Sequence, residues 1–151
     1  MSEWIPDHEW ETIVRRMPIV SVDLLVRYDG GLVFGKRTNE PAKGEWFIPG
    51  GRVSKGETRQ EAVHRVAEDE LGISVEIVES LGAFEHFYDT ADVEGVESKH
   101  YLANGYVVDL QDGNPGTDDD QHDAVEVFQS PPESLHPHIR AYLDASETLD
   151  W

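Results

Sequence analysis

Residues 59–71 constrain this chain most, because they have the pattern of an amphipathic helix with an acidic residue inside its apolar stripe. Thr58 and Glu61 have the spacing of a capping box, and Gly72 is the residue type that ends helices in a left-handed conformation. At ~100° per residue, Glu70 falls near the middle of the apolar stripe. The apolar members of that stripe are Ala62, Val63, Val66, Ala67 and Leu71.

Glu70 needs a partner if it is buried. Burying an unpaired ionised carboxylate costs more free energy than a marginally stable fold can tolerate, whereas a bound cation or an arginine removes most of that cost. The residues alone allow two interpretations. Glu70 is either a structural acid paired with Arg65 or Arg52, or a ligand of a metal ion.

The net charge of the chain excludes one class of partner. Thirty-one Asp and Glu against twelve Lys and Arg give a formal charge of −19 at pH 7. Such a field repels phosphates, so DNA and RNA are not expected to bind. Self-repulsion of this kind is screened at high ionic strength, and we therefore expect a halophilic source. The alternative is an ordinary acidic cytosolic protein.

Length and composition predict one domain, residues 1–151, in a reducing compartment. A chain of 151 residues can bury about two thirds of its unfolded surface. The sequence has no Cys, which excludes disulfides and thiolate metal sites. We find neither the apolar core of a signal peptide nor the ~18 apolar residues of a membrane span. We therefore expect a cytoplasmic protein that has no membrane partner.

Hydrophobic periodicity and turn residues predict a mixed α/β fold. One short helix is expected near residues 10–17 and another near 137–145. Residues 29–31, Asp-Gly-Gly, favour a hairpin between the first two strands. The expected strands are 19–28, 32–36, 46–48, 74–78, 82–88, 101–110 and 124–128. Strands around one amphipathic helix, with helices at both ends, indicate a sheet covered on two sides.

The spacing of residues around the central helix resembles the Nudix box. From Gly51 there follow five residues, Glu57, seven residues, Arg65 and then residues 69–73, DELGI. In the Nudix family this loop-helix-loop signature binds a divalent cation and a nucleoside diphosphate derivative. The resemblance implies an α/β fold of the Nudix type, an α/β/α sandwich with a mixed β-sheet.

The box departs from the usual Nudix pattern directly after Arg65. Val66 stands where the usual box has Glu, and Asp69 precedes Glu70 where the usual box has two Glu. Residues 18–128 look like the GDP-mannose mannosyl hydrolases, a Nudix subfamily that also lacks the Glu after the Arg. The similarity rests on the segments PIVSVDLLV, GKRTNEPAKGEWFIPGGRV, EHFYD, HY at His100–Tyr101, and DDDQHD.

This second resemblance implies a reaction at the sugar. Enzymes of that subfamily break the bond between the anomeric carbon and oxygen, with inversion, and release GDP and a free hexose. The resemblance also implies a nucleotide-sugar substrate and a homodimer. Two alternatives stay open. One is a conventional Nudix pyrophosphohydrolase, which cleaves a phosphoanhydride bond, with Asp69 and Glu70 sharing the metal. The other is a non-catalytic nucleotide-sugar sensor.

The resemblance further implies three ligands of one metal ion. These are a carboxylate oxygen of Glu70, the backbone carbonyl of Gly50 and the side-chain amide oxygen of Gln121. Hard oxygen ligands of this kind suit Mg²⁺ or Mn²⁺ and not zinc. Asp69 is an additional acid that either adds to metal binding or braces the box. Glu57 is expected to brace the loop through Arg or backbone groups.

A general base and the groups around the leaving diphosphate follow from the same resemblance. His122 maps onto the base that deprotonates water for attack on the anomeric carbon, and an imidazole with a reference pKa of ~6.5 suits that role. Arg37, Arg52 and Arg65 match positions that contact the diphosphate or orient the box, where the planar Arg fork suits phosphate oxygens. Tyr101 maps onto a hydrogen-bond donor to the leaving group.

Asp23 is the remaining candidate that stands out by its place in the chain. It lies in the middle of a predicted strand, where Asp is disfavoured because its side chain competes with the strand pairing and is costly to bury. The resemblance implies that Asp23 bonds hexose hydroxyls and that His86 belongs to the same pocket. The alternative for Asp23 is a solvated acid that faces an edge.

Overall fold

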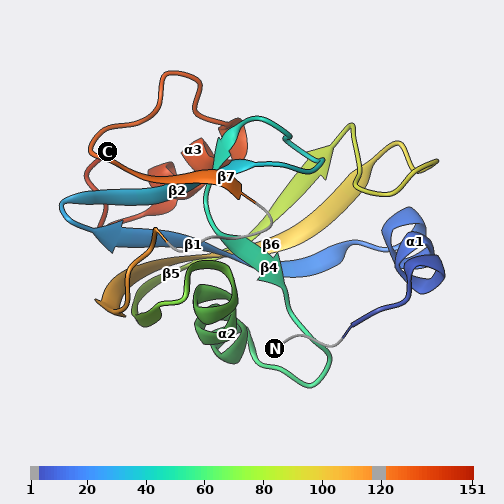
Figure 1. Cartoon of the computed structure of the whole chain (residues 1–151), viewed down its shortest axis with the longest axis horizontal. Helices are drawn as coiled ribbons and strands as arrows, with labels where there is room; N and C mark the ends of the chain where they lie inside the picture. The colour runs from blue at the N-terminus through green and yellow to red at the C-terminus, as the bar shows by residue number, and fades with distance from the viewer. Residues whose placement is uncertain (1–3, 117–121) are drawn as a thin grey trace.

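The computed structural model describes residues 4–116 and 122–151. Figure 1 shows helices on both sides of one sheet. The helices are α1 (Asp7–Arg16), α2 (Arg59–Leu71) and α3 (Pro137–Ala145). The strands are β1 (Ile19–Tyr28), β2 (Gly31–Arg37), β3 (Trp46–Phe47), β4 (Gly50–Arg52), β5 (Ser74–Tyr88), β6 (Lys99–Asp112) and β7 (His122–Phe128). In the part of the chain that the structure describes, no helix is long and apolar enough to cross a membrane.

The strands form one mixed sheet with β1 in its interior. The main path is β3-β2-β1-β6-β5, with β4 paired to β1 and β7 paired to β2. β1 and β6 are parallel, and Asp23 on β1 lies opposite Gly105 on β6. The other edge of β1 pairs with β4 along its first half and with β2 at its end. Asp23 therefore lies between two paired strands, so it is not an edge residue.

The side chains of β1 point into two different hydrophobic cores, one on each face of the sheet. Val22 and Leu24 are buried in the core that includes the apolar stripe of α2. Leu25 is buried in a second core, with Ile139 and Tyr142 of α3. Since successive side chains of a strand point to opposite faces, α2 and α3 cover opposite faces of the sheet, as Figure 1 shows. The expected α/β/α sandwich with a mixed sheet is confirmed.

The bounds predicted for the central helix are confirmed at both ends. The Thr58 hydroxyl accepts a hydrogen bond from the backbone N–H of Glu61 at 3.0 Å, and the Glu61 carboxylate accepts one from the Thr58 N–H at 2.9 Å. Gly72 ends the helix with a φ of 64° in the left-handed region. Glu70 is only 8% exposed, so an acidic residue is indeed buried in the apolar stripe.

Three elements differ most from the sequence prediction. Residues 74–88 form one strand instead of two, because bulges in β5 absorb the irregular register opposite β6. β4 was not predicted, since the short run Gly-Gly-Arg has no hydrophobic alternation. α1 begins at Asp7, about a turn before the predicted start, with Asp7 and Glu9 in its first turn, where acids interact favourably with the helix dipole.

Candidate active site

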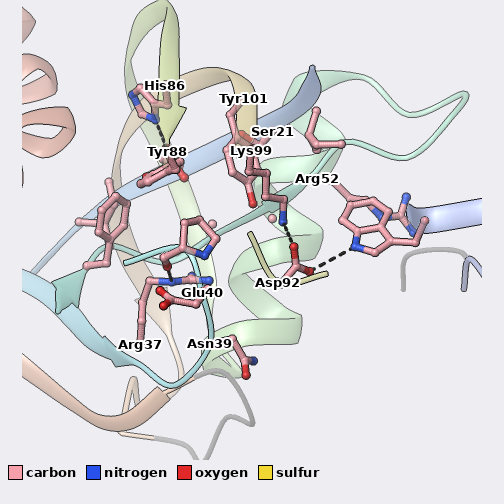
Figure 2. Close-up of a pocket in the computed structure, with 18 residues that line it drawn as sticks. Ser21, Arg37, Asn39, Glu40, Arg52, His86, Tyr88, Asp92, Lys99 and Tyr101 are labelled. Carbon is pink, nitrogen blue, oxygen red and sulfur yellow. Dashed lines mark hydrogen bonds and ion pairs between the residues drawn. The ribbon is translucent and has the colours of Figure 1, made fainter. Parts of the chain in front are cut away.

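A cavity of about 280 Å³ opens on the α3 side of the sheet, between β1, β4, β5, β6 and the loop after β2. Figure 2 shows side chains from these segments converging on it. Six residues that the sequence singled out line this cavity, namely Asp23, Arg37, Gly50, Arg52, His86 and Tyr101. Residues that are more than sixty positions apart in the chain are thus brought to one site.

The Asp23 carboxylate is held inside the cavity wall. Its side chain is 13% exposed, and its Oδ2 accepts a hydrogen bond from the Tyr142 hydroxyl at 2.6 Å. Burial raises the pKa of Asp23 to about 6, opposed by the hydrogen bond from Tyr142 and the charge of Arg37. The alternative of a solvated acid at an edge is therefore wrong.

His86 lies beside Asp23 as a neutral imidazole. Its Nδ1 is 3.9 Å from the Asp23 Oδ2, and its ring stacks on the His138 ring with centroids 4.1 Å apart. Burial, together with the charges that His138 and His136 can carry, lowers the pKa of His86 to about 3. Its Nε2 is buried and has no hydrogen-bond partner among the described residues. A neutral ring with one unsatisfied nitrogen is suited to bonding a hydroxyl group.

The cavity is also lined by a buried cation, Lys99, that the sequence prediction missed. The Lys99 ammonium pairs with Asp92 at 2.8 Å, and its side chain is 5% exposed. It lies 5.2 Å from the centroid of the Trp10 ring and 5.0 Å from that of Tyr101. The Trp10 indole donates to the same Asp92 carboxylate at 3.2 Å. These contacts tie α1 and the loop before β6 to the cavity, which already contains Arg52.

Arg37 connects the cavity to β7. Its Nε donates to the Pro41 carbonyl at 2.8 Å, which orients the guanidinium beside the cavity. The backbone of His122, the predicted base, lies opposite Arg37 in the β2–β7 pairing. The predicted ligand Gln121 lies outside the described residues, as does the side chain of His122.

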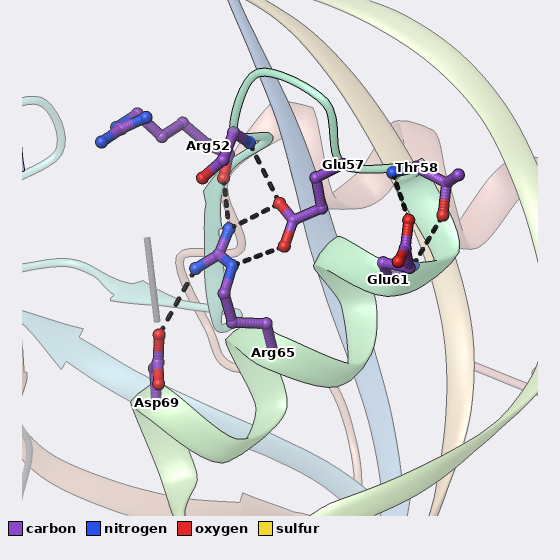
Figure 3. A network of polar contacts seen from close by, with 7 residues as sticks. Arg52, Glu57, Thr58, Glu61, Arg65 and Asp69 are labelled. Carbon is purple, nitrogen blue, oxygen red and sulfur yellow. Dashed lines mark hydrogen bonds and ion pairs between the residues drawn. The ribbon is translucent and has the colours of Figure 1, made fainter. Parts of the chain in front are cut away.

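A second polar network joins α2 to the loop before it, and Figure 3 shows it. The Arg65 guanidinium donates to both Glu57 oxygens at 2.7 and 3.0 Å, to the Arg52 carbonyl at 2.8 Å and to Asp69 at 3.4 Å. The bonds from Arg65 hold the pKa of the Glu57 carboxyl below its usual value. Arg65 is 13% exposed and Glu57 14%. We call the bonds from Arg65 to Glu57 and the Arg52 carbonyl the Arg65 clamp.

Close packing between α2 and β4 complements the Arg65 clamp. A Cβ added to Gly51 would lie 3.0 Å from a methyl group of Val66, which is tighter than ordinary contact. Gly50, the preceding residue, faces the other way, since a Cβ there would collide with the Asp23 carboxylate. Glu70 follows Val66 by one helical turn, on the same face of α2. Glu70 therefore lies on the face of α2 that is buried against the sheet.

These residues fit a hard divalent cation. Among the described residues, no group of three or more His, Cys, Asp or Glu side chains has the arrangement of a metal site. A cation here therefore depends on other oxygen donors besides Glu70, and a backbone carbonyl and an amide, as expected of Gly50 and Gln121, are donors of that kind. Glu70 supplies a buried carboxylate on the helix that packs against β4.

The comparisons with known proteins identify the family. A family model described as NUDIX domain matches residues 17–151. The chain belongs to the Nudix family.

Among the relatives of this Nudix protein is a Haloferax volcanii protein named "Low-salt glycan biosynthesis protein Agl8". The two are 57% identical over 141 residues, covering 93% of this chain and 90% of the relative. An "ADP-ribose pyrophosphatase" of Methanocaldococcus jannaschii is 32% identical over 107 residues, covering 71% and 60%. The crystal structure of a MutT NUDIX hydrolase from Burkholderia pseudomallei has a TM-score of 0.71 at 29% identity, covering 86% of this chain and 98% of that one. The Nudix resemblance of the sequence is confirmed.

Replacing Arg65 with Lys tests the Arg65 clamp. The variant keeps the charge but loses the planar fork that bonds Glu57 twice and reaches the Arg52 carbonyl. We expect the free energy of unfolding, measured by urea denaturation, to fall by about 2 kcal/mol.

Arg15→Lys is the matched control for this variant. Arg15 pairs with Glu11 on the surface of α1, where the two side chains are 48% and 42% exposed. We expect Arg15→Lys to lower the free energy of unfolding by less than about 0.5 kcal/mol. Equal destabilisation by the two substitutions would contradict the Arg65 clamp.

Proposed function

We propose that this Nudix hydrolase cleaves a nucleoside diphosphate sugar, of the GDP-mannose kind, by water attack at the anomeric carbon. The products are a nucleoside diphosphate and a free hexose, and the cofactor is Mg²⁺ or Mn²⁺. One observation carries the proposal. The same cavity combines arginines suited to a diphosphate, Arg37 and Arg52, with a buried Asp23–His86 pair suited to sugar hydroxyls.

The position after Arg65 supports attack at carbon over attack at phosphorus. Val66 is 1% exposed and packs against Gly51, so this place in the box is apolar and cannot supply the carboxylate of a conventional Nudix enzyme. A diphosphate is a good leaving group once its charge is neutralised. The proposed reaction therefore needs cations around the diphosphate and a base for water, rather than a row of acids.

We assign the cation to Glu70, the Gly50 carbonyl and Gln121. When bound, the cation neutralises the charge that develops on the departing diphosphate. Glu57 braces the box through Arg65, and Asp69 shares that guanidinium at 3.4 Å. Arg65 contributes to the site by fixing α2 against Glu57 and the backbone of β4.

The remaining residues act on water, sugar and leaving group. His122 deprotonates the attacking water, and its backbone lies opposite that of Arg37, which lines the cavity. Asp23 and His86 hold hexose hydroxyls. Tyr101 donates a hydrogen bond to the leaving oxygen, and Arg37 and Arg52 bind the diphosphate.

The names of two relatives favour different candidates. The name of the Haloferax volcanii relative, a glycan biosynthesis protein, is compatible with a nucleotide-sugar substrate. The name of the Methanocaldococcus jannaschii relative favours the second candidate, a pyrophosphohydrolase that cleaves a phosphoanhydride bond. The expected homodimer stays a prediction.

Product analysis in ¹⁸O-labelled water separates the two candidates. With GDP-mannose and Mg²⁺, attack at the anomeric carbon gives unlabelled GDP and free hexose, which mass spectrometry of the nucleotide detects. Because the anomeric oxygen of free mannose exchanges with water, the control incubates GDP and mannose in the same labelled water. GMP with hexose phosphate, or labelled GDP, would refute attack at carbon, and the absence of any product would favour a sensor.

His122→Gln tests the proposed base. The variant should lower kcat by at least ~10²-fold, with little change in KM, because loss of a general base acts on the chemical step. His64→Gln is the control, since His64 is exposed on α2, and it should leave kcat unchanged. A kcat near the wild-type value in His122→Gln would reject the assignment.

A further inference from the structure

Helix α3 contributes a layer of side chains behind Asp23 and His86. Tyr142 donates its hydroxyl hydrogen to Asp23, and His138 stacks on His86. His136, the N-cap of α3, accepts a hydrogen bond from the backbone N–H of His138 at 3.1 Å through its Nδ1. Both residues expected in the hexose pocket, Asp23 and His86, thus have a direct neighbour from α3.

Tyr142 is fixed in place by the sheet beneath it. Its side chain is fully buried, and its ring lies over Gly105, where an added Cβ would be only 2.5 Å from the ring. Gly105 is the register partner of Asp23 on the neighbouring strand. The Phe84 ring packs against Tyr142 edge to face, with centroids 4.8 Å apart. The missing side chain at Gly105 is therefore what lets the Tyr142 hydroxyl reach Asp23.

The two carboxylate oxygens of Asp23 have different surroundings. Oδ2 accepts from Tyr142 at 2.6 Å and lies 3.9 Å from the His86 Nδ1. Oδ1 points to Gly50, since a Cβ on Gly50 would collide with it, and both residues line the cavity. The carboxylate therefore has one oxygen held from behind and the other turned to the cavity wall.

His86 is held from behind in the same way. The His138 ring is nearly parallel to the His86 ring, at 4°, and its Nε2 is 3.4 Å from the Phe87 carbonyl. The buried Nε2 of His86 has no partner among the described residues. An unsatisfied buried nitrogen next to a cavity is an observation that a ligand hydroxyl would explain.

We propose that Tyr142 is a positioning residue for hexose selectivity: its hydroxyl aims Asp23 so that the carboxylate and His86 read adjacent sugar hydroxyls. The inference rests on the proposed nucleotide-sugar substrate. A site built to bond a hydroxyl rejects a sugar that lacks or misplaces it, because the buried polar groups are then left unpaired. Rotation of Asp23 would relax that selection.

Tyr142→Phe removes the hydroxyl and keeps the ring over Gly105. We expect kcat/KM for GDP-mannose to fall by about tenfold, and the preference for GDP-mannose over GDP-glucose to shrink by a similar factor. The inhibition constant of GDP should stay at the wild-type value, because GDP has no hexose to contact Asp23. Thermal unfolding of the variant checks that the fold is intact.

Two further variants separate positioning from a general effect on the core. Tyr106→Phe alters a buried tyrosine, 3% exposed, in the core on the α2 face. It should change neither kcat/KM for GDP-mannose nor the preference for GDP-mannose over GDP-glucose. In an Asp23→Asn background, Tyr142→Phe should cause little further loss, because both changes act through one hydrogen bond. The inference would be overturned if Tyr142→Phe kept the wild-type preference for GDP-mannose, or if it weakened inhibition by GDP as much as it lowered kcat/KM. It would also be overturned if the losses from Tyr142→Phe and Asp23→Asn were fully additive.

The same assays distinguish this inference from the proposed function. If the wild-type protein released GMP and hexose phosphate, attack at carbon would be refuted. The effect of Tyr142→Phe on the choice between the two GDP-hexoses, relative to inhibition by GDP, would still decide whether Tyr142 positions Asp23.

Discussion

The bonds of Arg65 to Glu57 and to the Arg52 carbonyl are the interaction on which the rest of the site depends. One guanidinium, 13% exposed, joins the middle of α2 to the loop before it and to the backbone of β4. Charge-assisted, bidentate bonds in a partly buried place are strong and directional. They hold the helix so close to β4 that a Cβ on Gly51 would lie 3.0 Å from a methyl group of Val66. These contacts fix the place of α2, which carries Glu70, against β4.

β1 connects the two halves of the site across the sheet. Val22 packs on the α2 side, whereas Asp23, the next residue, faces α3 and the cavity. β4 alternates in the same way, with Gly51 against α2 and Gly50 against Asp23. The strand period of two thus turns Val22 and Gly51 towards α2, and Asp23 and Gly50 towards the cavity.

The sequence predicted what depends on local rules and missed what depends on tertiary contacts. The capping box and Gly72 define both ends of α2. Asp23 was noticeable because an acid in mid-strand is costly. Tyr142 carried no such signal, since its hydrogen bond to Asp23 spans 119 positions of the chain. Lys99 was missed for the same reason. It is buried by an ion pair with Asp92 and by two aromatic rings, and these contacts produce no pattern in the sequence.

The affinity for Mn²⁺ in the presence of GDP, measured by electron paramagnetic resonance titration, tests the central claim that Glu70 is a cation ligand. Glu70→Gln keeps the shape of the side chain but removes its charge, and it should weaken Mn²⁺ binding by at least ~10-fold, since even outer-shell partners of metal ligands contribute that much. Glu68→Gln, two residues away on the exposed side of α2, should bind Mn²⁺ as the wild type does. Wild-type affinity in Glu70→Gln would contradict the account.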